Sequence, residues 1–389
     1  MHFLLLTVSL AFSAPATLPA HRLAVTNDGR LALPEATFAV VGNTRPVSPG
    51  LDRARTVEGS HSEDVIGDII AQGLLGTLDF VVHTGDMVTH SSTPNWRSFA
   101  EQFSSLLDGS TAAATASKRV PIVPVAGDRD CVKQPDCTTF SKVFPGFGNN
   151  IGYGRASTWQ SFELAIGDGP PWKVLVLDSN KKALGSRWNE QNSWLREQAK
   201  NPQRGLLVFI HEPPVSILES KGSQYSSELI EIIETNAPLM SIKAVFSAGP
   251  SMTQALMPGG AFGTAHFAGG GGGTPAVDFP IGLNGSKIDQ MLAPGFSDGL
   301  DQLVRTYAAL ESAPPERLVE EALGKGSFEG YARRISGADF PTHGWWKVEA
   351  VQDKLSVTWR CRQPDGTFQN QSAWMWTAAD GWEASNGKQ

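Results

Sequence analysis

The sequence predicts an α/β layered domain, in which helices pack outside a central sheet, and two observations support that prediction. Short apolar runs have the length and composition of strands, at 37–42, 79–84, 120–125, 173–178, 205–211, 243–247 and 263–268. Amphipathic stretches with apolar residues at helical spacing lie between several of these runs. Because most of the runs are apolar throughout, we expect strands that are covered on both faces.

The first helix is expected at 60–76, between the first two strands. Ser60 and Glu63 form a capping-box pattern there. The apolar residues at helical spacing are Val65, Ile69, Ile70 and Leu74. A second helix is expected at 95–107, and its apolar stripe is Trp96, Phe99, Phe103 and Leu106. A third is expected at 189–200, before the strand at 205–211.

The pattern changes toward the C-terminus. Between 279 and 336, amphipathic segments split by Pro314 and Pro315 predict a helical insertion. Strand-like runs return at 343–351 and 354–362. We therefore divide the chain into a main domain at 35–278, the insertion at 279–336 and C-terminal strands at 337–389.

Composition and the N-terminus limit the classes of function. The chain has 389 residues, and its net charge of −7 argues against a nucleic-acid partner, which would require a basic face. An apolar run from Phe3 to Ala14, followed by Pro15 and Ala16, is typical of a signal peptide and is shorter than the about 20 residues of a membrane span. We expect residues 1–16 to be removed, the protein to be periplasmic or extracellular, and no transmembrane segment beyond the signal peptide.

The three cysteines fit an oxidising compartment. Cys131 and Cys137 are close enough in sequence to close a small disulfide loop, and Cys361 would then be unpaired. Free cysteines buried as small apolar residues are the alternative.

Polar clusters follow the apolar strands at their carboxyl ends. They are GNTR at 42–45, GDMVTH at 85–90, GDRD at 127–130, HEPP at 211–214 and AGPSM at 248–252. In open α/β folds ligands bind at this edge of the sheet. The charged run Asp128, Arg129 and Asp130 is costly at the end of a buried strand unless it is paired or bound, so we expect a site there.

The order and spacing of these clusters resemble the calcineurin-like metallophosphoesterase superfamily, including the purple acid phosphatases. The strands of that family end in DxH, GDxxD, GNHD or GNHE, a lone His before a proline-containing turn, and GHxH. The resemblance covers about residues 37–275 and extends to LDS at 177–179, WL at 194–195 and the glycine-rich turn at 267–275. It implies a four-layer α/β/β/α sandwich.

The resemblance also implies a two-metal site, in which cations about 3.5 to 4 Å apart clamp phosphate oxygens and activate a hydroxide. For the first ion, Asn43 and Arg45 replace the Asp and His of DxH, and Met252 replaces the second His of GHxH. A guanidinium has no lone pair to give, and a thioether is a poor ligand for such cations. Only Asp86 remains, so we expect the first position to be empty.

The second position keeps more of its ligands. Asp86 and Asp128 bring carboxylates, His211 keeps the place of the lone His, and Pro250 removes the fourth ligand. These three side chains could hold one divalent ion, namely Mn, Zn or Fe. Arg129 stands where the family has its catalytic His, and it cannot give up its proton, so no catalytic residue is secure.

Charge counting favours a metal-free core, in which Arg45 and Arg129 neutralise Asp86 and Asp128 as paired ions. Guanidinium nitrogens within about 3 Å of both carboxylates would favour this interpretation. The same arginines could instead bind a phosphate or another anionic ligand. We therefore expect an exported, catalytically impaired phosphoesterase-domain protein, a pseudoenzyme. The alternative is an active mononuclear metal-dependent phosphoester hydrolase that uses Asp86, Asp128 and His211.

Other polar and aromatic residues are expected to be structural. The histidines in question are His83, His90, His266 and His343. The run GGGGG at 269–273 lacks the spacing of a dinucleotide-binding loop and is expected to be a turn. The C-terminal tryptophans are expected to pack inside the sandwich; they are Trp345, Trp346, Trp374, Trp376 and Trp382.

Overall fold

The structure is a computed structural model. It describes residues 30–46, 61–108, 120–132, 134, 137–144, 158–200, 202, 204–214, 223–238, 241–248, 253–256, 263–269, 271–272 and 343–385. The expected signal peptide at 1–16 and the expected insertion at 279–336 lie outside these ranges. None of the described helices is both long enough and apolar enough to cross a membrane.

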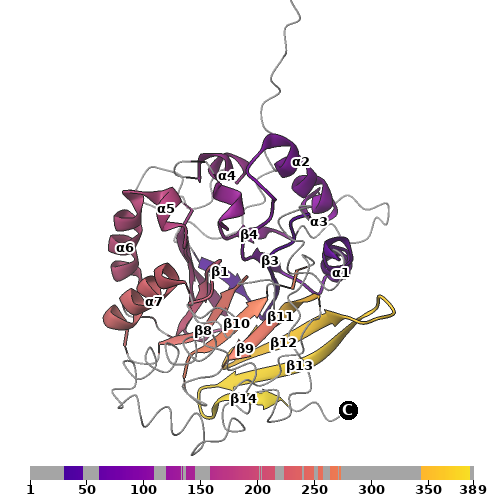
Figure 1. The fold of residues 1–389 in the computed structure, drawn as a ribbon. Helices are drawn as coiled ribbons and strands as arrows, with labels where there is room; N and C mark the ends of the chain where they lie inside the picture. Colours follow the sequence, from indigo (N-terminus) through magenta and orange to yellow (C-terminus); the bar gives the residue numbers. More distant parts are fainter. Residues whose placement is uncertain are drawn as a thin grey trace, which may run out of the picture.

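The described strands form two seven-stranded sheets (Figure 1). The first sheet has the order β1 (Arg30–Leu33), β5 (Gln160–Ile166), β6 (Trp172–Val176), β7 (Leu206–Phe209), β8 (Ile242–Ser247), β10 (Ala265–Gly269) and β9 (Thr253–Leu256). The second has the order β14 (Gly381–Ser385), β13 (Phe368–Thr377), β12 (Lys354–Arg362), β11 (Gly344–Val351), β2 (Ala36–Val41), β3 (Phe80–His83) and β4 (Ile122–Pro124).

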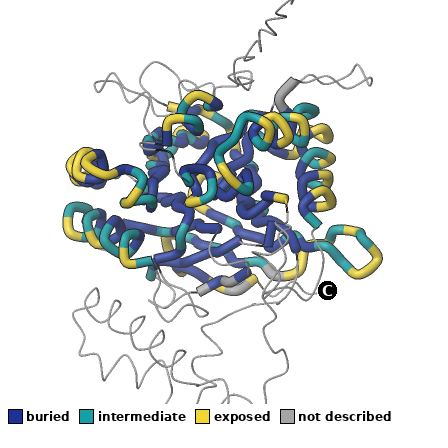
Figure 2. The backbone as a smooth tube through the Cα atoms, turned by 45° about the horizontal axis from the view of Figure 1, so that its top comes forward, coloured by how far each residue is buried: buried dark blue, intermediate teal, exposed yellow. Residues whose placement is uncertain are grey.

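Helices cover both sheets from outside. Next to the second sheet lie α1 (Ser62–Leu74), α2 (Thr93–Gln102), α3 (Ser104–Asp108), the 3-10 turn η1 (Arg129–Cys131) and α4 (Thr138–Val143). Next to the first sheet lie α5 (Lys181–Leu184), α6 (Arg187–Gln198) and α7 (Gln224–Asn236). In Figure 2 the strands are mostly buried, while exposed residues gather on the outer faces of the helices and on the loops.

Three apolar clusters show how these layers are held together. Between the sheets, the rings of Phe38 in β2 and Phe209 in β7 lie 6.2 Å apart, and those of Phe267 in β10 and Trp346 in β11 lie 5.3 Å apart. In a second cluster, helices α1, α2, α3 and α4 pack against the second sheet. A third joins α6 and α7 to the first sheet. The predicted α/β class is confirmed, because the described residues form two sheets and the helices that pack on them.

The strands that carry the polar clusters run in the same direction. β2 pairs in parallel with β3, and β3 with β4. In the other sheet, β7 pairs in parallel with β6 and β8. The carboxyl ends of neighbouring parallel strands therefore meet at one edge of each sheet, and the segments after β2, β3, β4 and β7 supply the site described below.

Every apolar run named from the sequence contains a strand, and the three helices expected at 60–76, 95–107 and 189–200 are present. The apolar stripe at 95–107 is buried as predicted, although the helix is divided at Phe103 between α2 and α3. Strands β1, β5 and β9 were not among the strands predicted from the sequence.

The predicted capping box at Ser60 and Glu63 is wrong. The N-cap residue of α1 is His61, and its side chain makes no capping hydrogen bond. The residue at N3 is Asp64, whose carboxylate accepts a hydrogen bond of 2.7 Å from Arg362 Nε in β12. The start of α1 is thus tied to the C-terminal strands by an ion pair.

The disulfide between Cys131 and Cys137 is present, which confirms that prediction, and Cys361 is free and buried. The C-terminal tryptophans are also in the core, each at most 6% exposed, as expected; they are Trp345, Trp346, Trp374, Trp376 and Trp382.

Candidate metal site

Asp86, Asp128 and His211 lie together at the carboxyl ends of β3, β4 and β7. One ligand atom from each of these residues lies within 4.8 Å of the other two. His211 Nε2 is 3.5 Å from Asp86 Oδ1 and 3.5 Å from Asp128 Oδ1. The fold therefore brings together the three residues that the sequence singled out as a single metal site.

A backbone hydrogen bond fixes the orientation of His211. Its Nδ1 lies 2.8 Å from the carbonyl oxygen of Thr84, which can only accept, so Nδ1 carries a proton. In the neutral ring, the lone pair of Nε2 then points toward the two carboxylates. Histidines that bind metals in proteins commonly have this arrangement, in which the other ring nitrogen donates to a carbonyl or carboxylate.

The three groups form one coupled acid–base cluster. Burial opposes the charged form of His211, but Asp86 and Asp128 raise its pKa to about 10. Burial raises the pKa of Asp86 to about 8, and His211 opposes that shift. Burial also opposes the charged form of Asp128, yet its hydrogen bond with His211 holds the pKa of Asp128 below its usual range. Negative charge is thus concentrated on Asp128, the more exposed of the two carboxylates.

The two arginines contact the outer oxygens of the carboxylates. Arg45 Nε lies 3.4 Å from Asp86 Oδ2, and both side chains are buried. Arg129 Nε lies 3.9 Å from Asp128 Oδ2, and its side chain is one-third exposed. Both distances are longer than the nitrogen–oxygen distance of about 3 Å that we expected if the arginines and carboxylates formed a metal-free core of paired ions. The Oδ1 atoms, which face His211, are left on the other side of each carboxylate.

The first metal position of the family does not fit the residues that replace its ligands. Asn43 is buried with a φ of 55°, and its N–H donates to Gly85 O over 2.9 Å. Arg45 places a positive charge beside the one carboxylate, Asp86, that this position keeps. Pro250 and Met252 lie outside the described residues. A second cation would meet a guanidinium instead of an imidazole, so the residues present fit one metal ion and not two.

Asp130 was named from the sequence as part of the charged run 128–130, but its role at the site was not predicted. Its buried carboxylate accepts hydrogen bonds from the backbone of the loops that carry Asp86 and Asp128. Burial raises the pKa of Asp130 to about 6, while hydrogen bonds from the amides of Gly127, Val88 and Met87 oppose the shift. Its position as the last acid of GDRD is evident from the sequence. Its hydrogen-bond donors are backbone N–H groups, which every residue type except proline carries, so the sequence could not identify them.

The four histidines that the sequence analysis expected to be structural lie outside the triad, and three of them are buried. His83 Nδ1 accepts from Gly85 N over 3.2 Å, so its Nε2 donates to Thr44 Oγ1 over 2.8 Å. Burial lowers the pKa values of His83 and His266 to about 3, and that of His343 to about 4. His90 is exposed and lies within hydrogen-bond distance of Asn95.

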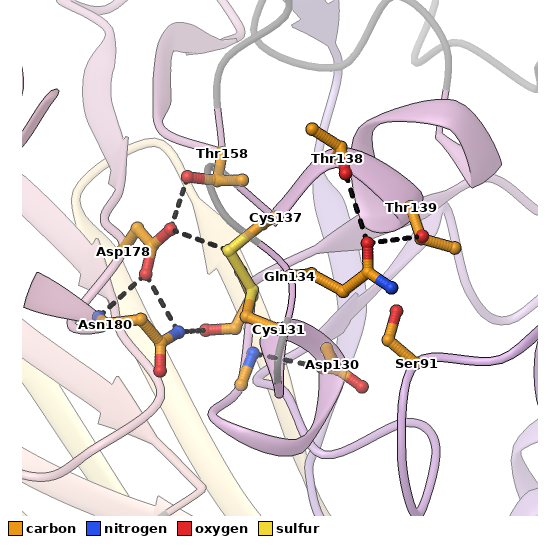
Figure 3. Close-up of a disulfide and its surroundings, with 12 residues drawn as sticks. Ser91, Asp130, Cys131, Gln134, Cys137, Thr138, Thr139, Thr158, Asp178 and Asn180 are labelled. Atoms are coloured by element: carbon orange, nitrogen blue, oxygen red, sulfur yellow. Dashed lines mark hydrogen bonds between the residues drawn. A yellow bond between two sulfur atoms is a disulfide. The ribbon is translucent and has the colours of Figure 1, made fainter. Parts of the chain in front are cut away.

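The disulfide braces the loop that carries Asp128 (Figure 3). Cys131 directly follows Asp130, and Cys137 lies against Asp178, the second residue after the end of β6. The carboxylate of Asp178 accepts from Thr158 Oγ1 and from Asn180, and Asn180 Nδ2 donates to Ala126 O over 3.1 Å. The two sulfurs are bonded to each other, so this cluster is not a second metal site.

Comparisons with known proteins show the fold. No family model and no curated protein matches the sequence. A purple acid phosphatase from yellow lupin seeds is 12% identical with a TM-score of 0.50, over 88% of this chain and 54% of the lupin chain, so this chain spans about half of that enzyme. PhoD is 12% identical over 92% of this chain and 73% of its own, with a TM-score of 0.49. A dimetal phosphatase from Danio rerio is 12% identical over 87% of this chain and 99% of its own, with a TM-score of 0.48.

Proposed function

From the calcineurin-like metallophosphoesterase fold of this chain, we propose that the protein binds one divalent metal ion at Asp86, Asp128 and His211 and has lost most of the hydrolytic activity of its fold family. The observation that carries the proposal is the division of the carboxylate oxygens. Both Oδ1 atoms face His211 Nε2, while both Oδ2 atoms face arginines. The space for a cation is therefore separate from the positions of the guanidinium groups.

The donor set suits several divalent ions. Two carboxylate oxygens and one imidazole nitrogen are acceptable to Mn²⁺, Fe²⁺ and Zn²⁺, and three protein ligands leave positions for water. The charge count from the sequence favoured a metal-free core, but it did not include the direction in which each arginine lies. Because the arginines contact the outer oxygens, they reduce the negative charge of the site but do not occupy the space for the cation.

Loss of hydrolysis follows from two substitutions. A bound metal ion would polarise a phosphoryl oxygen and lower the pKa of a bound water. Arg129, at the position of the family's catalytic His, keeps its proton at working pH and cannot protonate a leaving group. Arg45 removes the second cation that would share the charge of the transition state. What the chain retains is cation binding, with two arginines beside it that can attract an anionic group.

The second candidate function is slow phosphoester hydrolysis with a single metal ion. Arg45 and Arg129 favour it, because guanidinium groups can hold a phosphate near the ion. Arg129 is one-third exposed and is therefore accessible to such a group.

One set of measurements tests both candidates. Purified protein is titrated calorimetrically with Mn²⁺, Zn²⁺ and Fe²⁺, and hydrolysis of an aryl phosphate and an aryl phosphodiester is assayed with each metal. Stoichiometry near one that is lost in Asp86→Ala and His211→Ala, and kept in the control His90→Ala, supports the proposal. Absence of binding by the wild type overturns it. Metal-dependent turnover that is lost in His211→Ala establishes the second candidate instead.

We also propose that the protein is exported. The apolar N-terminal run and a disulfide of the kind that persists in oxidising compartments support this. N-terminal sequencing of the protein secreted from its full-length precursor tests it. Cleavage near residue 16 is the expected result, and an uncleaved, intracellular protein would contradict it.

A further inference from the structure

We infer that Asp130 is the positioning residue of the metal site, because its carboxylate holds the turn that carries Asp86 against the loop that carries Asp128. The inference deepens the proposed function and, in its metal-binding part, rests on it. Asp130 is fully buried and lies two residues after Asp128.

The carboxylate of Asp130 lies in a nest of backbone amides. Its Oδ2 accepts from Asp86 N and from Gly127 N, each over 3.0 Å. Its Oδ1 accepts from Met87 N over 3.0 Å and from Val88 N over 3.2 Å. Three successive amides after β3 and one after β4 thus converge on one side chain. Hydrogen bonds from amides to an ionised carboxylate are about twice as strong as neutral ones.

The turn that this carboxylate holds has an unfavourable backbone conformation. Asp86 has a φ of 57° and Gly85 a φ of 101°. The left-handed conformation costs a non-glycine residue roughly 1 to 2 kcal/mol and persists only where surrounding contacts impose it. The amide bonds to Asp130 are contacts of that kind, and they act on Asp86 itself and on the two residues that follow it.

The same turn lies against the loop after β4 with no room between them. A Cβ atom at Gly127 would lie 2.2 Å from Asp86 N and 2.7 Å from Asp86 Oδ1. The backbone N–H of Arg129 donates to Asp86 Oδ1 over 3.1 Å. Asp86 Oδ1 is one of the two oxygens that face His211, so a shift of this loop against the turn changes the spacing of the proposed ligands.

The chemistry of the nest explains why the residue is an aspartate. Four donors need acceptor lone pairs on both oxygens of the side chain. In Asp130→Asn the amide NH₂ would face two N–H donors, and these buried donors would lose their acceptor. In Asp130→Glu the carboxylate remains, but its longer side chain must fit a fully buried space. We therefore expect Asp130→Glu to keep more of the function than Asp130→Asn.

The test compares Asp130→Asn and Asp130→Glu with Asp68→Asn. Asp68 is a matched control, because its carboxylate also accepts from several donors, but it lies in α1 and these donors, Trp345 Nε1 and Arg360, lie in β11 and β12. Three quantities are measured on each variant: the unfolding temperature, the Kd for Mn²⁺ by calorimetry at a temperature where the variant is folded, and the hydrogen exchange of the amides of residues 86–88.

We expect Asp130→Asn to weaken Mn²⁺ binding roughly tenfold to a hundredfold, as for other partners that orient metal ligands, and to accelerate exchange at residues 86–88. Asp68→Asn should lower the unfolding temperature and leave the other two quantities unchanged, and Asp130→Glu should recover part of the affinity. A folded Asp130→Asn protein with wild-type Kd and wild-type exchange would overturn the inference.

The exchange measurement separates this inference from the proposed function. If the wild type binds no Mn²⁺, the proposed function fails, but faster exchange at residues 86–88 in Asp130→Asn would still support Asp130 as the group that holds the turn. Unchanged exchange would overturn the inference whether or not the metal binds.

Discussion

At the scale of single residues, the site is defined by which oxygen of each carboxylate meets which partner. Asp86 and Asp128 each present one oxygen to His211 and the other to an arginine. The sequence identified all five residues from their positions after strands, but not this division. A side chain's direction depends on local backbone conformation, such as the positive φ of Asp86, and the residue types do not encode it.

The position of Arg45 predicts that it weakens metal binding while it stabilises the folded protein. Arg45→Gln removes a positive charge that lies 3.4 Å from Asp86 Oδ2 in a buried pair. We expect Mn²⁺ to bind roughly fivefold to tenfold more tightly, because less repulsion opposes it. In EDTA, the unfolding temperature should fall, because the buried carboxylate of Asp86 loses one of its two charged partners and keeps only His211.

Calorimetry and thermal unfolding check both directions. Arg360→Gln is the control, because this arginine pairs with Asp68 at α1 instead of with the site. Weaker Mn²⁺ binding in Arg45→Gln would contradict the interpretation that the guanidinium competes with the cation.

The buried neutral histidines predict loss of stability in acid. The folded-state pKa of His83 is lowered to about 3 by burial, below the 6.5 of an exposed histidine. Its contribution to stability is therefore complete above pH 6.5 and is lost as the pH falls from 6.5 toward 3. At pH 4.5 the loss is on the order of 2 kcal/mol. His266 adds a loss of the same sign.

Urea unfolding at pH 7.5 and pH 4.5 measures this loss. His83→Gln can keep one donor and one acceptor without titrating, so the difference between the two pH values should shrink. The exposed His90 supplies the control, His90→Gln. An undiminished pH difference in His83→Gln would assign the acid sensitivity to other groups.

At the scale of elements, the strands were predictable because they are short, apolar and buried on both faces. The edge strands β1 and β9 were missed because RLAL and TQAL contain only one β-branched or aromatic residue between them, whereas the equally short β3 and β7 have the sequences FVVH and LLVF. The capping prediction failed at α1 because the N-cap residue is His61 instead of Ser60, which places Asp64 at N3, and Asp64 is paired with Arg362 from β12. Contacts of that kind are set by the assembled fold, and local sequence does not reveal them.

The disulfide predicts a local effect on the loop that carries Asp128. Cys131 and Cys137 are six residues apart, so closing this small loop stabilises the fold by about 2 kcal/mol. We expect the double variant Cys131→Ser, Cys137→Ser to lose about that much in urea unfolding and to bind Mn²⁺ more weakly, because Cys131 directly follows Asp130. Cys361→Ser is the control, since it removes a buried cysteine that is not bonded. Equal Mn²⁺ affinity in the double variant and the wild type would show that the loop is held without the bridge.

At the scale of the whole molecule, the core between the two sheets joins segments from both ends of the chain. β2 lies between β3 and β11, so the strand that leads into the site pairs on one side with a C-terminal strand. β12, β13 and β14 then extend the sheet on that side. Indole rings from these strands fill the core against the other sheet, as the contacts of Trp346 with Phe267 and of Trp376 with Trp172 show.

This arrangement predicts that the site cannot form without the C-terminal strands. Removal of residues 343–389 would expose the edge of β2 and take away buried indoles, each of which stabilises a core by several kcal/mol, about 3 to 5 for Trp→Ala. We expect the truncated chain to be insoluble or to lack a cooperative unfolding transition, and to bind no Mn²⁺.

The full chain with Lys354→Ala, an exposed residue at the start of β12, is the control for changes in this region that leave the core intact. Circular dichroism, gel filtration and calorimetry on both chains make the comparison. A monomeric truncated chain that unfolds cooperatively and binds Mn²⁺ like the full chain would show that the site belongs to the first 342 residues alone.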